Sequence, residues 1–374
     1  MASPLLSSDT QAILLLCGRL GYAPTESAKA LNLREYNHLA QVLHRNGMRP
    51  ADLLRPDGVK ELQKTKMPLV DPDRLVALLA RGAALALAVE SWGSKGIWVL
   101  SRAHSGYPHR LKKKLGHLAP PILYGIGDKT LLSDGGLAVV GSRDVDSEGL
   151  DFTSKVVSIC ARQGIQIISG GARGVDRKAM ESALDEGGNV ICVLANNLAR
   201  AAVSRQYRVS IMERSLVLVS PYDPDAGFAV GRAMGRNKHM YALSDWALVV
   251  SSSFDKGGTW AGATENLKRK WTPLFVRSGD MVPDGNRHLI ERGGTSMPSD
   301  VLSGEVDLCE WFARMRVQSN SKETENVRYT AIPRQLALKE GEPSELYVEA
   351  ESPADSGSQK KSTAHQQLDL PLDQ

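Results

Sequence analysis

Two loops in this sequence combine small residues with an arginine, a combination that suits phosphate binding. In "VVGSRDVDSEG", Gly141 permits close backbone approach, Ser142 offers a hydroxyl, and Arg143 can form two hydrogen bonds to one phosphate. In "SGGARGVD", which begins at Ser169, Arg173 lies among glycines that precede a helical segment. Backbone N–H groups and the helix dipole favour an anion at such a position. The glycines of this second loop are Gly170, Gly171 and Gly174.

Two further loops repeat the combination. The stretch "GRAMGRNKHM" groups Arg236, Asn237 and Lys238. The stretch "SSSFDKGGTWAGATENLKRK" presents Lys256 and then the small residues Gly257, Gly258 and Thr259. One such loop often serves packing alone, and one nucleotide needs only one of them. A row of cationic loops instead suits a polyanion, or one bulky nucleotide with an enclosed phosphate.

Catalytic and metal motifs are weakly represented. The loops do not match GxGxxG, and GxxxxGK[ST] and GxSxG are missing. Asp144, Asp146 and Glu148 could hold a metal, but acids at a helix start more often complement the helix dipole. Asp176 and Glu265 are the best acid–base candidates. The cysteines, Cys17, Cys160, Cys192 and Cys309, form no metal or disulfide pattern, and we expect no metal and no cofactor.

The loops require a scaffold that brings them together, and the surrounding sequence predicts one. Short apolar runs alternate with alanine-rich helical segments from about residue 97, which predicts an α/β fold. We expect a parallel sheet with helices on both faces, whose carboxyl edge gathers the loops. The predicted strands are "IWVLS", "PILYGIG", "LAVVGS", "IQIISGG", "NVICVLA", "LVLVS", "WALVVSS" and "PLFVRSG".

The chain divides into three predicted parts. Residues 1–95 form a small all-α domain, with helices starting near Ser8 and at Thr25. Residues 96–315 form the α/β domain. Residues 316–374 are polar and aperiodic, which predicts a mostly disordered tail.

The composition limits the classes of function that are possible, but it does not identify one. The chain has 374 residues, of which 42% are hydrophobic and 24% charged, as in ordinary globular proteins. Its net charge of +4 permits nucleic-acid binding and requires any basic surface to be local. We find no signal peptide and no membrane-spanning segment in the sequence, and we expect a cytoplasmic protein without a membrane partner.

Six motifs, in order, resemble the DprA/Smf family of DNA-processing proteins. They are "YPHRLKKKLGHLAPPILYGIGD", "LAVVGSRDVDSEG", "IISGGARGVDRKAMESALDEGGNVICVLA", "GRNKHMYALSD", "KGGTWAGATENL" and "DGNRHLIERGG". The sequence departs from the family at Met180, where the family usually has histidine, and at Lys238, where it has a second arginine. A Tyr-Pro pair is also missing, and no C-terminal winged helix is evident. These departures indicate a divergent branch.

The resemblance implies an extended Rossmann-like fold. It also implies a non-catalytic protein that binds single-stranded DNA and loads a recombinase during natural transformation. It also implies a homodimer or higher oligomer, and it admits a role in phage defence with a toxic enzyme as partner. The phosphate-gripping positions would be Arg143, Gly170, Gly171, Arg173, Arg236, Asn237, Lys256 and Gly258. Backbone contacts should dominate, with Trp260 or Tyr241 available for base stacking.

Two other features leave alternatives open. "KGGTWAGATE" is similar to a loop of nucleotide-processing phosphoribohydrolases, which implies an N-glycosidase or nucleotide sensor that uses Glu265. Near the C-terminus, "QQLDLPLDQ" resembles the motif by which bacterial proteins bind the replicative sliding clamp. Its contacting residues would be Gln367, Leu368, Leu370 and Leu372.

Overall fold

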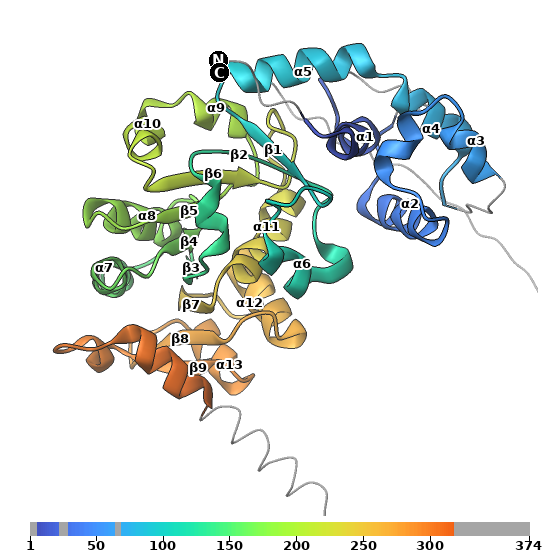
Figure 1. Cartoon of the computed structure of the whole chain (residues 1–374). Helices are drawn as coiled ribbons and strands as arrows, with labels where there is room; N and C mark the ends of the chain where they lie inside the picture. The colour runs from blue at the N-terminus through green and yellow to red at the C-terminus, as the bar shows by residue number, and fades with distance from the viewer. Residues whose placement is uncertain (1–5, 22–28, 64–68, 318–374) are drawn as a thin grey trace, which may run out of the picture. The chain divides into compact units, whose positions relative to one another are not determined.

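A nine-stranded sheet forms the centre of the protein (Figure 1). The computed structural model describes residues 6–21, 29–63 and 69–317. All eight predicted strands are present, and a ninth follows them that the sequence did not indicate. The strands are β1 (Trp98–Ser101), β2 (Ile122–Ile126), β3 (Leu137–Gly141), β4 (Ile167–Ser169), β5 (Val190–Val193), β6 (Leu216–Ser220), β7 (Trp246–Ser251), β8 (Leu274–Ser278) and β9 (Thr295–Pro298).

The strand order is β1-β2-β6-β5-β4-β3-β7-β8-β9. From β6 to β9 all neighbours are parallel, whereas β1 pairs with β2 and β2 with β6 in antiparallel fashion. The chain moves outward from β3 to β6 and then returns to place β7 on the other side of β3. This reversal is the switch point at which ligands bind in doubly wound sheets.

Helices cover both faces of the sheet. Alternate residues of β3 show the division, since Leu137 and Val139 join one core and Ala138 and Val140 the other. Helices α7 and α8 pack on the first face and α6, α11, α12 and α13 on the second (Figure 1). The helices of this part of the chain are α6 (His109–Leu115), α7 (Ser147–Arg162), α8 (Val175–Asp185), α9 (Leu198–Ala202), α10 (Arg205–Met212), α11 (Val230–Leu243), α12 (Gly257–Arg269) and α13 (Asp284–Glu291).

Helices are present in the predicted N-terminal part, and the first begins at Ser8, as predicted. It is capped by Ser7, whose side chain accepts from Thr10 N, and the second described helix begins at Leu33. The start predicted at Thr25 lies outside the described residues. Asn32 and Glu35 form a reciprocal capping box at the start of the second helix, a signal that the sequence reading overlooked. These helices are α1 (Ser8–Cys17), α2 (Leu33–Arg45), α3 (Gly58–Gln63), α4 (Pro72–Leu79) and α5 (Gly82–Ser94).

Short 3-10 helices and one further helical stretch complete the described elements. The 3-10 helices are η2 (Pro50–Leu54), η3 (Gly116–Leu118), η4 (Lys129–Ser133) and η5 (Ser299–Leu302), and residues 308–317 are helical. None of the described helices is long and apolar enough to cross a membrane by itself, although α4 and α5, bent by 50°, reach the length and composition limits as a pair. The described residues all belong to one compact unit, so the domain boundary at residue 95 stays a prediction.

Candidate nucleic-acid interface

A cavity of about 540 Å³ lies at the switch point, beside the carboxyl ends of β3 and β7. We call it the central cavity. Of the residues that the sequence proposed for phosphate binding, nine line it. They are Gly141, Ser142, Arg143, Arg236, Asn237, Lys256, Gly257, Gly258 and Thr259.

A second cavity of about 520 Å³ adjoins the first, beyond the ends of β4 and β5. We call it the flanking cavity. Gly170, Gly171 and Arg173 line it, together with the neutral side chain of Asn196. The two cavities share Arg143, Ala172, Phe228, Ala233 and Arg236. They therefore form one groove along the carboxyl edge of the sheet, and we refer to both together as the carboxyl-edge groove.

Two helices begin at the groove, and neither places a capping side chain or a carboxylate at its start. The residues before α11 and α12 are Ala229 and Lys256, and neither provides a side-chain cap. Neither helix has an acid in its first turn. By contrast α7 is capped by Asp146, which accepts from Gly149 N at 2.7 Å. The free N–H groups and positive dipole ends of α11 and α12 therefore remain available to an anion.

Asp176 is already an anion within the groove wall. It is buried, and the nearby backbone N–H groups of Ala172, Gly141 and Gly170 favour its charged form. Burial raises the pKa of Asp176, while the nearby Arg236 guanidinium and these N–H groups oppose the rise. The Gly170 N–H that the sequence assigned to a phosphate therefore faces a carboxylate in this structure.

Arg236 connects the loops through hydrogen bonds to their backbone. It is 8% exposed, and its Nη1 donates to the carbonyls of Gly170 and Val193. Its Nη2 lies 3.4 Å from Asp176 Oδ2. Its Nε is buried without a hydrogen-bond partner. Arg236 thus lines the groove while most of its donors hold the protein itself.

Exposed cations occupy the rim instead. Arg143 is exposed, with its guanidinium 5.9 Å from the ring centroid of Phe228. Arg173 forms an ion pair of 2.7 Å with Asp144, and both side chains are mostly exposed. Lys256 is exposed at the start of α12. An exposed ion pair contributes about 0–1 kcal/mol, so a phosphate can replace Asp144 at little cost.

Three proposed residues do not line either cavity. Ser169 is fully buried and donates its hydroxyl hydrogen to Val139 O at 2.8 Å. Gly174 has a φ of 85°, and a Cβ there would lie 2.3 Å from Ser142 O, so its glycine serves the turn into α8. Lys238 is partly buried, and the carboxylate of Glu265 on α12 acts on its charge. Burial lowers the pKa of Lys238, and Glu265 opposes this effect.

The aromatic assignments of the sequence reading were wrong. Tyr241 is fully buried and Trp260 is 5% exposed, so neither can stack on a base. The exposed rings are Phe228 in the groove and Phe254 in the loop after β7, at 58% and 44% exposure. An exposed aromatic among glycines directly before a helix was the signal that could have identified Phe228.

The acidic residues singled out in the sequence lie apart from the groove or beside a buried arginine. Glu265, on which the N-glycosidase alternative depends, is exposed on α12 and does not line the groove. Asp146 and Glu148 lie 3.5 and 3.3 Å from the buried Arg277, as expected for structural charges. Within residues 6–21, 29–63 and 69–317 we find no group of three His, Cys, Asp or Glu side chains that could hold a metal ion. The clamp-binding residues Gln367, Leu368, Leu370 and Leu372 lie outside the described residues.

Curated proteins with related sequences are DNA-processing proteins. DprA of Streptococcus pneumoniae is 29% identical over 196 residues, which are 50% of this chain and 67% of that protein. DprA of Bacillus subtilis is 25% identical over 217 residues, 57% of this chain and 72% of that protein. Protein Smf of Escherichia coli is 33% identical over 188 residues. The match covers 49% of this chain and half the length of the E. coli protein.

One solved structure shows a similar fold. The crystal structure of DprA from S. pneumoniae has a TM-score of 0.52 and 19% identity, and the match covers 72% of this chain and 99% of that one. The model of the family described as DNA recombination-mediator protein A matches residues 98–303, more than half of the chain. These residues include the whole of the carboxyl-edge groove. The chain therefore belongs to the DprA/Smf family of DNA recombination-mediator proteins.

Proposed function

We propose that this protein binds single-stranded DNA through its carboxyl-edge groove without cleaving it. One observation carries the proposal. The two cavities join at Arg143 and Phe228, which places an exposed cation beside an exposed aromatic ring midway along the groove. Proteins that hold single strands combine these two features, since cations follow the phosphates and rings stack on bases.

The extent of the groove favours a strand over a single nucleotide. Arg173 lines only the flanking cavity and Lys256 only the central cavity, while Arg143 lines both. A single phosphate can occupy one of these positions. Successive phosphates of one strand can contact all three cations, and the uncapped start of α12 adds N–H donors beside Lys256.

Single substitutions at Arg143 and Arg173 test the proposal. Arg143→Ala and Arg173→Ala should each weaken binding of an oligothymidylate. Each should also reduce the slope of log K against log salt by about 0.7, the value for one phosphate contact on a single strand. Asp144→Asn should have the opposite effect on affinity, because it releases Arg173 and removes the negative charge beside this arginine.

A matched ion pair at the other edge of the sheet provides the control. Arg162 and Glu186 lie 3.6 Å apart at the ends of α7 and α8, and both are exposed. Arg162→Ala and Glu186→Gln change the same charges far from the groove and should leave affinity and salt slope unchanged. Wild-type affinity in both Arg143→Ala and Arg173→Ala would refute the proposal.

The pathway and the protein partners are part of the proposal. Family membership supports a role in recombination or transformation, and the divergent positions support phage defence as the other setting. A recombinase is the expected partner in the first case and a toxin in the second, with the chain acting as a homodimer or higher oligomer. Pull-downs with and without nuclease separate direct partners from proteins bridged by DNA.

The C-terminal motif adds a separate proposal, that the chain binds the sliding clamp. Deletion of residues 366–374 should abolish clamp binding while leaving DNA affinity intact. A wild-type chain that does not bind clamp would end this part of the proposal.

A further inference from the structure

A second concavity, of about 710 Å³, lies at the amino edge of the same sheet. Its wall includes Ser133, Asp245 and Pro273, which stand close before β3, β7 and β8 in the chain. We call it the amino-edge basin. Six cationic side chains line it, namely Arg110, Lys113, Lys114, Arg269, Lys270 and Arg316.

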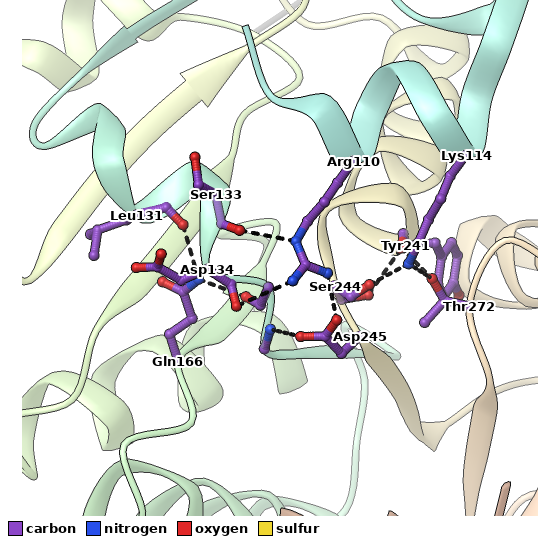
Figure 2. A network of polar contacts seen from close by, with 12 residues as sticks. Arg110, Lys114, Leu131, Ser133, Asp134, Gln166, Tyr241, Ser244, Asp245 and Thr272 are labelled. Atoms are coloured by element: carbon purple, nitrogen blue, oxygen red, sulfur yellow. Dashed lines mark hydrogen bonds and ion pairs between the residues drawn. The ribbon is translucent and has the colours of Figure 1, made fainter. Parts of the chain in front are cut away.

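Two of these cations hold the basin together (Figure 2). Arg110 donates to the carbonyls of Ser133 and Asp134 and pairs with Asp245. Lys114 donates to Ser244 O and, at 2.7 Å, to Thr272 Oγ1. The contact with Ser244 caps the end of α11, and the contact with Thr272 fixes the residue before Pro273. Arg110 and Lys114 are therefore structural parts of the wall.

Three other cations are uncommitted. Lys113, Arg269 and Arg316 are exposed, and no carboxylate in the described part of the chain forms an ion pair with any of them. Two of these three also affect a side chain of the wall. Together with Arg110, the charges of Lys113 and Arg316 lower the pKa of Lys114. Burial is the largest cause of this shift, which brings the pKa of Lys114 to about 8.

The negative charge at helix ends does not compensate this much positive charge. Helices α6, α11 and α12 end at the basin, and each carries roughly half a negative charge at its terminus. Asp245 is the single carboxylate among the lining residues. Lys270 has an interaction of its own, and the other five cations still exceed this compensation, in a chain whose net charge is only +4. Such an excess at a concave surface favours a ligand that brings several negative charges.

We propose that the amino-edge basin binds the phosphate backbone of a second single-stranded segment, so that one chain holds two segments at once. The choice of nucleic acid among polyanions rests on the proposed function. The two sites are separate, since β7 has six residues and spans about 20 Å between its ends. The carboxyl-edge groove begins at one end of β7 and the basin at the other.

A short oligonucleotide can count the two sites. We would titrate hexathymidylate into the full chain at low salt and measure the molecules bound per chain by calorimetry and native mass spectrometry. The wild type should bind two. The variant Lys113→Ala/Arg269→Ala/Arg316→Ala should bind one, because it removes the uncommitted cations and keeps Arg110 and Lys114. On a long oligothymidylate it should reduce the salt slope by about 2.

The control removes three exposed cations from other helices, in the variant Arg34→Ala/Lys155→Ala/Arg208→Ala, and should bind two molecules. A basin variant that binds as many molecules as the wild type, with an unchanged salt slope, would overturn the inference. These results differ from failure of the proposed function. In that case Arg143→Ala/Arg173→Ala would bind as many molecules as the wild type, and only the basin variant would bind fewer.

Discussion

The guanidinium of Arg236 lies 3.4 Å from the carboxylate of Asp176, and the two side chains are only 10% and 5% exposed. The same guanidinium donates to carbonyls at the ends of β4 and β5. Backbone N–H groups of the loops after β3 and β4 in turn favour the charged form of Asp176. This buried pair therefore fixes the loops that carry Arg143 and Arg173. We infer that Arg236 acts on DNA mainly by positioning these two arginines.

Removing the charge of Asp176 should destabilise the fold. Asp176→Asn keeps the size of the side chain and leaves Arg236 buried without a carboxylate. Breaking a buried pair in this way costs about 3–5 kcal/mol. Urea unfolding should show a loss of that order, whereas Arg143→Ala, at an exposed position, should stay within about 0.5 kcal/mol of wild type. Equal stability of Asp176→Asn and wild type would contradict the structural role of the pair.

Two glycines of the groove should respond differently to a methyl group. A Cβ on Gly170 would lie 1.6 Å from Arg236 Nη1, so Gly170→Ala should displace Arg236 and lower the melting temperature by several degrees. A Cβ on Gly258 meets only Asn237 Nδ2, at 3.7 Å. Gly258→Ala lies in α12 and should be as stable as wild type or about 0.5–1 kcal/mol more stable.

DNA binding should then separate the two glycines further. If a strand approaches the start of α12 closely, Gly258→Ala should weaken binding of oligothymidylate although the protein remains fully folded. Circular dichroism melts and fluorescence titrations on the same samples provide both measurements. Normal DNA affinity in Gly258→Ala would show that the strand keeps its distance from this helix.

The sequence predicted the sheet well because its strands are buried on both faces. Such strands read as continuous apolar runs, and those from β3 to β8 follow this pattern. It missed β9, whose sequence "TSMP" is short and carries a single buried residue, Met297. It also expected parallel pairing throughout, whereas β1 and β2 are antiparallel. Strand direction at a sheet edge depends on how the chain returns, which local composition does not encode.

The sequence predicted which loops form the site, but it did not predict the contacts between their side chains. Glycine and arginine spacing identified the loops, and the topology places them at one edge. Sequence cannot reveal that Asp176 and Arg236 neutralise each other across two helices, because that depends on distances between segments 60 residues apart. The burial of Tyr241 and the exposure of Phe228 likewise follow from which helix face packs on the sheet.

Phe228 should contribute to DNA affinity without contributing to its salt dependence. The ring is 58% exposed and lines both cavities beside Arg143. Removing an aromatic platform costs about 1–3 kcal/mol for each stacked base. Phe228→Ala should therefore weaken oligothymidylate binding by about 1–3 kcal/mol and leave the salt slope unchanged, since no phosphate contact is lost. An exposed apolar residue away from the groove, Val209, provides the control in Val209→Ala.

His239 should make the stability of the protein sensitive to acid. The ring is buried on α11, and burial, with a smaller effect of Lys238, lowers its pKa to about 3. The unfolded chain binds this proton with a pKa of about 6.5, so protonation favours unfolding. Stability should therefore fall as the pH drops below about 6.5, and the loss should grow until about pH 3. At pH 5 the loss from this group should be about 2 kcal/mol.

The variant His239→Gln isolates this effect, because glutamine remains neutral at every pH used. We would measure the free energy of unfolding in urea at pH 7.5 and at pH 5 for both proteins. Wild type should lose about 2 kcal/mol more than His239→Gln between these two conditions. Other titrating groups affect both proteins equally and cancel in the difference. Equal losses would mean that His239 takes up its proton as easily in the folded protein as in the unfolded chain.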